Sequence, residues 1–295
     1  MSPQLIVALA FALACCAAHA DTYTATANGN SPDGGPCISH GGGLPGQTSS
    51  APVGADLNCA DPTGFGRSAA SAQTGVLGAS GEAVINSSLS FFALGAASAT
   101  FDTRVTFSIS NPTLFTGTQA SVGSIVVVHG VLNAAGFASA TASFQEQLGG
   151  NFLLSYTISE GGGELPTCSG VVGPGAPCSF DPANPLHSVQ VVVPIGVPVD
   201  FLMSLGVRAQ ANGAGSASAT ADWGDTMSLP LDGPVFDLPA GLTANDTDAF
   251  IFDNRFVPPG TVSAVDEPSV LWLLAAGLGA FRTFGRRQRR RELRR

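Results

Sequence analysis

The sequence predicts an all-β protein, an antiparallel two-sheet sandwich of the jelly-roll kind, followed by a single C-terminal transmembrane helix. Three observations lead to this fold class. Polar and apolar residues alternate over several segments, clusters of Gly, Pro and Asn separate these segments, and the body has no stretch with the 3.6-residue spacing of an amphipathic helix. The body, residues 67–257, is long enough to bury a substantial core. Eight or more short strands in one domain favour two sheets packed face to face.

The clearest strand covers residues 98–110, where apolar residues such as Phe101 and Phe107 alternate with Ser, Thr, Asp and Arg. A second covers residues 215–223, where three alanines and Trp223 share one face. Small Ala side chains on inner faces would let two sheets lie close together. Six further strands are expected at residues 83–94, 121–132, 137–145, 151–159, 186–193 and 197–210.

Residues 21–66 are rich in Gly, Pro, Ser and Asn and are expected to form a disulfide-pinned loop region ahead of the main sheets. Four cysteines belong to the body, and they allow three connectivities. The sequential pairing is favoured because each local pair brackets a Gly/Pro-rich loop. The expected disulfides are therefore Cys37 with Cys59 and Cys168 with Cys178.

The N-terminus is typical of an exported protein. Residues 5–16 form an apolar stretch too short to span a membrane, and Ala18-His19-Ala20 is an A-x-A cleavage pattern. Residues 1–20 are therefore expected to be a signal peptide that signal peptidase removes, with Asp21 as the first mature residue. A lipoprotein attached through one of the two cysteines before Ala18 is the alternative.

The C-terminus contains three consecutive features. Residues 258–269 form a linker that ends in Asp266-Glu267-Pro268-Ser269, residues 270–285 form an apolar run, and residues 286–295 are rich in arginine. A sixteen-residue helix reaches about 24 Å, slightly less than a hydrocarbon core of about 30 Å. Dense positive charge stays cytoplasmic, so residues before the helix should face outward. The arginines of the tail are Arg286, Arg287, Arg289, Arg290, Arg291, Arg294 and Arg295.

This order of motif, membrane helix and Arg cluster resembles the PEP-CTERM sorting signal of Gram-negative bacteria that produce exopolysaccharide. The family has P-E-P where this chain has Asp266-Glu267-Pro268. The resemblance implies that an exosortase in the membrane cuts near the motif. The protein would then be anchored transiently in the inner membrane before it reaches the cell surface or the extracellular space. A plain C-terminal membrane anchor is the alternative.

Charge narrows the choice of partners. Residues 21–265 carry eighteen acidic residues and four arginines, and the chain has no lysine. So acidic a surface repels nucleic acid and other anionic polymers, whereas neutral polysaccharides and divalent cations remain compatible with it. The aspartates that could offer oxygen ligands to Ca²⁺ are Asp222, Asp225, Asp246 and Asp248. The sequence predicts no other cofactor.

These patterns predict a non-catalytic exported protein of the cell envelope or extracellular matrix. A calcium-assisted carbohydrate-binding module that holds exopolysaccharide is the first alternative, and a hydrolase with an unrecognised site is the second. A glycosidase would need two carboxyl groups about 5 to 9.5 Å apart in a cleft, and the spacing of the residues cannot establish this. The glutamates of the body are Glu82, Glu146, Glu160 and Glu164.

Overall fold

The chain folds into antiparallel β-strands, as expected. The computed structural model describes residues 21–40, 48–162, 166–171, 185–246 and 250–259, and within these ranges it contains strands and no α-helix. The strands are β1 (Thr22–Asn30), β2 (Cys37–His40), β3 (Thr48–Ser49), β4 (Val53–Asp61), β5 (Gly64–Gln73), β6 (Val76–Ile109), β7 (Gln119–Val128), β8 (Val131–Ala135), β9 (Ala138–Leu148), β10 (Asn151–Gly161), β11 (Thr167–Val171), β12 (Leu186–His187), β13 (Val191–Pro194), β14 (Pro198–Ser228), β15 (Phe236–Asp237), β16 (Leu242–Asn245), β17 (Ile251–Phe252) and β18 (Arg255–Phe256).

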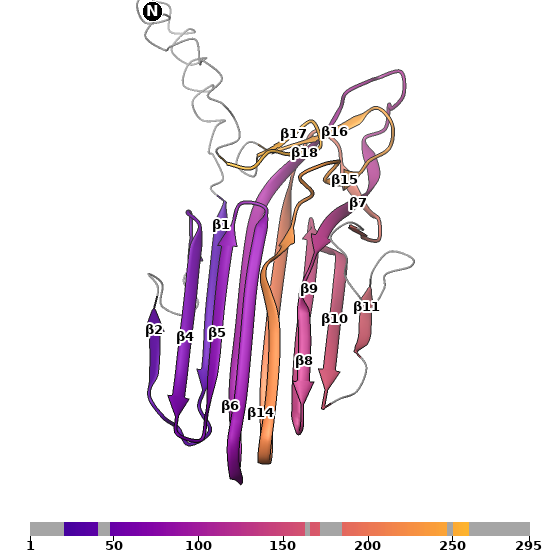
Figure 1. The fold of residues 1–295 in the computed structure, drawn as a ribbon. Helices are drawn as coiled ribbons and strands as arrows, with labels where there is room; N and C mark the ends of the chain where they lie inside the picture. Colours follow the sequence, from indigo (N-terminus) through magenta and orange to yellow (C-terminus); the bar gives the residue numbers. More distant parts are fainter. Residues whose placement is uncertain (1–20, 41–47, 163–165, 172–184, 247–249, 260–295) are drawn as a thin grey trace, which may run out of the picture. The chain divides into compact units, whose positions relative to one another are not determined.

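Two long strands, β6 and β14, form the centre of the sheet. They pair with each other from Thr106 and Pro198 at one end to Val76 and Ser228 at the other. On one side of this pair the order continues through β5, β4 and β2, and on the other through β9, β10 and β11 (Figure 1). The β4–β5, β5–β6 and β9–β10 pairs are hairpins, because short turns join these consecutive antiparallel strands.

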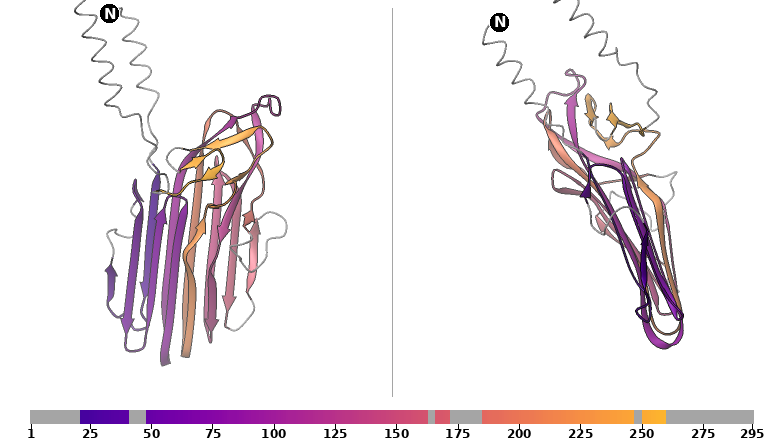
Figure 2. Two further views of the ribbon diagram at one scale, coloured as in Figure 1. Left: turned by 45° about the horizontal axis from the view of Figure 1, so that its top comes forward. Right: turned by 90° about the vertical axis from the view of Figure 1, so that its left-hand side faces the viewer.

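The sandwich is one sheet folded over, because β6 and β14 run through both layers (Figure 2). Pairing of the two strands jumps from Gly213 with Phe91 to Gly215 with Ser87, and this irregularity bends the ladder. The first layer holds β4, β5, residues 76–87 of β6, residues 215–228 of β14, and β8. The second holds β1, residues 94–109 of β6, residues 198–213 of β14, β9 and β10. The sequence predicts a two-sheet sandwich of antiparallel strands, and the two layers agree with it, although one continuous sheet forms both.

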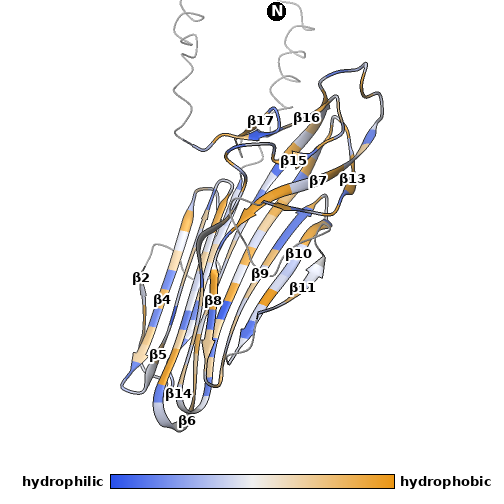
Figure 3. Cartoon of the chain, turned by 45° about the vertical axis from the view of Figure 1, so that its right-hand side comes forward, coloured by the Kyte–Doolittle hydropathy of each residue, from blue (hydrophilic) through white to orange (hydrophobic). Residues whose placement is uncertain are grey.

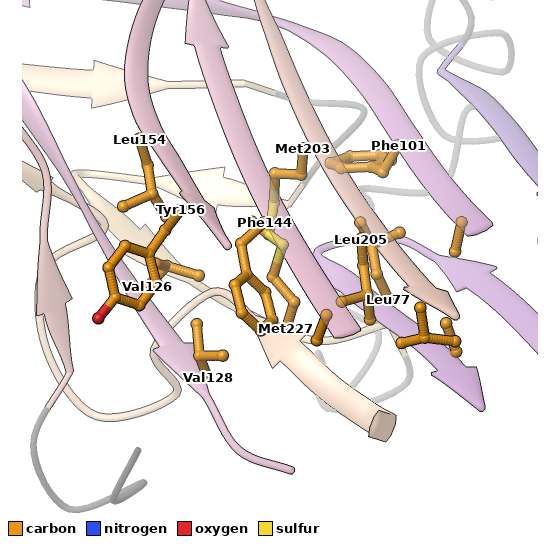
Figure 4. Close-up of a cluster of buried hydrophobic side chains, with 14 of the residues drawn as sticks. Leu77, Phe101, Val126, Val128, Phe144, Leu154, Tyr156, Met203, Leu205 and Met227 are labelled. Atoms are coloured by element: carbon orange, nitrogen blue, oxygen red, sulfur yellow. The ribbon is translucent and has the colours of Figure 1, made fainter. Parts of the chain in front are cut away.

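Hydrophobic and hydrophilic residues alternate along the strands, so each layer presents an apolar inner face (Figure 3). Large side chains gather away from the bend, where Phe101, Phe144, Met203, Leu205 and Met227 pack together (Figure 4). Near the bend the inner faces carry mainly alanine, and the core is correspondingly thin. The buried alanines around it include Ala79, Ala83, Ala93, Ala97, Ala140, Ala209, Ala211, Ala217 and Ala219.

Beside the bend the two layers touch backbone to backbone. A Cβ placed on Gly95 of β6 would lie 2.0 Å from the carbonyl oxygen of Arg67 in β5 and 2.5 Å from that of Glu82. On Gly66 it would lie 2.1 Å from the carbonyl oxygen of Leu94. Glycine is required at both positions because any side chain would force the layers apart.

The N-terminal region differs from the prediction of a loop ahead of the sheets. Within residues 21–66, β1 pairs with β6 over nine residues, from Thr22 with Asp102 to Asn30 with Leu94, and β4 pairs with β5. Alanines of β1, including Ala25 and Ala27, are buried in the core. Short alternating runs of Thr and Ala resemble a polar loop in composition, yet their small apolar face fits the thin part of the sandwich.

Candidate functional site

A polar groove of about 510 Å³ crosses the outer face of the first layer, over β4, β5, β6 and β14. Cross-strand pairing arranges its side chains in two parallel rows. One row consists of Asn58, Arg67, Glu82 and Thr220, and the other of Asp56, Ala69, Ser80 and Asp222. Strand alternation turns all of these side chains away from the core, so the groove is open to solvent.

Arg67 is held in place from three sides. Its guanidinium carbon lies 4.1 Å from the centroid of the Phe65 ring, and its Nε donates a hydrogen bond of 3.2 Å to Asn58 Oδ1. A third contact, 3.9 Å long, joins the guanidinium to Glu82 Oε2. Both charged side chains are about half exposed, so this ion pair contributes little to stability. Its effect is to orient the guanidinium along the groove.

Acidic groups outnumber basic ones in the groove. Asp56, Glu82 and Asp222 line it together with the single arginine, Arg67. Three carboxyl groups against one guanidinium give the groove a formal negative charge, as the rest of the body has. Asp222, one of the calcium candidates of the sequence, therefore lies on the outer face of the sheet, between Ser80 and Val131 of neighbouring strands.

Asp246, another calcium candidate, lies elsewhere, in a buried polar cluster. Its Oδ2 accepts a hydrogen bond from the Thr103 hydroxyl, and both residues are buried. The cluster continues to Tyr23, whose hydroxyl donates to Asp21 Oδ2 over 3.1 Å and lies 2.7 Å from Thr74 Oγ1. Burial, together with the charges of Asp21 and Asp246, raises the pKa of Tyr23 to about 12.

The expected calcium ligands come from two stretches of the sequence, and the structure describes one side chain of each. Asp222 is on an outer sheet surface, whereas Asp246 is buried beside Thr103. The side chain of Asp225 and the whole of Asp248 lie outside the described residues. Within the part of the chain that the structure describes, no three His, Cys, Asp or Glu residues are grouped so that they could hold a metal ion.

Glu146 was not expected in the core. It is fully buried on β9, where its Oε2 accepts a hydrogen bond from the hydroxyl of Ser124 in β7. Its Oε1 has no hydrogen-bond partner among the described residues. Burial raises the pKa of this carboxyl to about 7, although the hydrogen bond from Ser124 acts to lower it. The signal was the alternation of Phe144, Glu146 and Leu148, which continues three residues beyond the end of the predicted strand.

A histidine–carboxylate pair also emerged only from the structure. His187 Nδ1 lies 2.7 Å from Asp237 Oδ2. The two residues are about 50 positions apart and meet because β12 and β15 both pair with β7, at Ile125 and Gly123. Both side chains are well exposed, so the pair is a surface contact of modest energy.

The structure confirms one expected disulfide and bears on the second. Cys37 and Cys59 face each other across the β2–β4 ladder and are bonded. Cys168 is also disulfide-bonded, while Cys178, its expected partner, lies outside the described residues. Ala18, Ala20, the motif 266–269, the apolar run 270–285 and the Arg tail 286–295 lie outside them too. Among the described residues, no helix is long and apolar enough to cross a membrane.

Comparison of the chain with protein-family models, with curated proteins and with solved structures gives no match.

Proposed function

We propose that this chain is an exported, non-catalytic protein of the cell envelope or extracellular matrix, delivered through a PEP-CTERM-type sorting signal. The observation that carries the proposal is the disulfide between Cys37 and Cys59. Disulfides form and persist in oxidising compartments outside the cytoplasm. This agrees with the signal peptide expected from the sequence.

The boundaries of the folded unit support the same proposal. Asp21, the expected first mature residue, directly precedes β1, and the compact unit ends at Pro258, before the motif that begins at Asp266. Removal of residues 1–20 by signal peptidase and cleavage by an exosortase near the motif would leave every described strand intact. Between these two steps the apolar run 270–285 would hold the protein in the inner membrane.

Two epitope tags in one protein test the proposal. One tag is inserted in the turn at Gly149 and Gly150, where a side chain on Gly150 would meet no atom within 4 Å, and the other follows Arg295. In a Gram-negative host with an exosortase, the extracellular fraction should contain the turn tag without the C-terminal tag. An isogenic host without exosortase should retain both tags in its membrane fraction. A Glu267→Ala, Pro268→Ala variant produced in the host with exosortase should also retain both tags in the membrane fraction, as wild type does in the host without it.

Recovery of both tags in the cytoplasmic fraction would refute export. Recovery of both tags on one membrane-bound chain in the exosortase-positive host would show that the C-terminus is a plain anchor.

A further inference from the structure

The groove over β4, β5, β6 and β14 has the form of a track that crosses the strands. Asp56 and Asp222 stand at its two ends, with Ala69 and Ser80 between them. These two small residues form the floor, and longer side chains rise at either end. Neighbouring strands are about 4.8 Å apart, so an extended polymer laid across the sheet would meet new polar groups at every strand.

The groove presents hydrogen-bond donors and acceptors side by side. Arg67 offers several N–H donors, the Asn58 amide offers both kinds of group, and the carboxylates accept. The hydroxyls of Ser80 and Thr220 can do either. A ligand that matches this surface must itself carry many groups that both donate and accept. Hydroxyl groups have that property.

Charge excludes an anionic ligand. Three carboxylates and one guanidinium line the groove, and residues 21–265 hold eighteen acidic residues against four arginines. An anionic polymer would be repelled both by the groove and by the surrounding surface. The ligand is therefore uncharged, or it is a cation.

A single cation does not fit the spacing. Asp56 and Asp222 stand in one row with two strands between them, which places their Cα atoms about 14 Å apart. Calcium requires its oxygen ligands at about 2.3 to 2.6 Å, so one ion could not bind both carboxylates. Carboxylates spread along a track suit a longer ligand with repeated hydrogen-bond donors. Ammonium groups only donate and would leave the donors of Arg67 and Asn58 without an acceptor, whereas hydroxyl groups satisfy both kinds of group.

We propose that this groove binds a segment of a neutral polysaccharide through direct hydrogen bonds. The inference rests on the proposed export, because such a polymer would be met outside the cell. Arg67 is already fixed by Phe65, Asn58 and Glu82, so little side-chain freedom is lost when a sugar binds to it.

Co-sedimentation of the purified full-length protein tests the proposal. The probes are the neutral and acidic fractions of the producing bacterium's exopolysaccharide, separated by anion exchange, each with and without EDTA. Saturable binding to the neutral fraction, unchanged by EDTA, is expected. The Asp56→Asn, Asp222→Asn double variant, which keeps side-chain size, should bind at least tenfold more weakly, because it removes two charged acceptors.

The matched control is Asp200→Asn, which removes an exposed carboxylate paired with Arg104 in the second layer. It should bind the neutral fraction as wild type does, and thermal melts should show that all variants fold. Equal affinity of the double variant and wild type for the neutral fraction would refute the assignment of the groove as the binding site. Loss of binding in EDTA, preference for the acidic fraction, or no binding would each overturn the proposed recognition. The tag experiment above decides export independently of every one of these outcomes.

Discussion

Glu146 gives the sharpest test of the core, because an ionised carboxylate at this position would be buried. Burial favours the neutral acid, and the pKa in the folded protein rises to about 7 from the usual 4.5 of a glutamate. The folded state therefore holds a proton that the unfolded state releases between these pH values. The stabilising contribution of the neutral carboxyl is fully present below about pH 4.5 and is lost as pH rises through about 7.

The magnitude follows from the size of the pKa change. Each pKa unit corresponds to about 1.4 kcal/mol, so the free energy of unfolding should fall by about 3 kcal/mol between pH 4 and pH 8 through this group alone. Glu146→Gln has no proton to lose. The difference in unfolding free energy between this variant and wild type should therefore change by about 3 kcal/mol, in favour of the variant, over the same range.

Urea unfolding followed by circular dichroism at several pH values from 4 to 8 measures this difference. The control is Glu82→Gln, the same substitution at an outer-face glutamate whose side chain is 40% exposed. A Ser124→Ala variant adds a directional check. It removes the hydrogen bond that lowers the pKa, so the loss of stability should move to higher pH. Parallel pH profiles of Glu146→Gln and wild type would refute the reasoning.

Three further predictions concern the tight layer contact, the disulfide and the buried tyrosine. Gly95→Ala should destabilise the fold by about 3 kcal/mol in urea unfolding, because the new Cβ would collide with backbone of the facing layer, whereas Gly161→Ala, which meets no atom within 4 Å, should change it little. Cys37→Ser, which removes the disulfide to β4, should lower the unfolding free energy by about 3 kcal/mol, and reduction of the wild type, which also breaks the disulfide of Cys168, should lower it at least as much. Asp21→Asn should lower the pKa of Tyr23 below about 12, because a neighbouring negative charge is removed, and absorbance titration of the phenol should show the change. An unchanged phenol titration would contradict the assigned contact.

Much of the strand content could be predicted, and its limits have a physical origin. Phe101 and Phe107 indicated a strand correctly, because every second residue of a strand with one buried face is apolar. The sequence predicts two strands, at residues 83–94 and 98–110, and gives no sign that they form the single strand β6. The bend between the layers depends on Gly213 and on pairing with a strand about a hundred positions away.

Candidate sites were harder to predict, because sequence neighbours on a strand point to opposite faces. Asp222 and Asp246 were both candidates for calcium because other acidic residues are near them in sequence, yet Asp222 lines an outer groove and Asp246 is buried beside Thr103. Conversely, Asp56 and Arg67 join Asp222 in one groove only through the order of strands. The residues of such a site come together through pairing of strands that are distant in the sequence, and amino-acid composition does not predict that pairing.

The passage of β6 and β14 through both layers sets the order in which the protein can fold. Their ladder joins residues roughly a hundred or more positions apart, and contacts of such long range form slowly. A growing or translocating chain that ends before Pro198 contains the 34 residues of β6 without the strand that covers one of its edges. The ladder of β6 and β14 therefore closes only after Ser228, about three quarters of the way along the chain, has emerged.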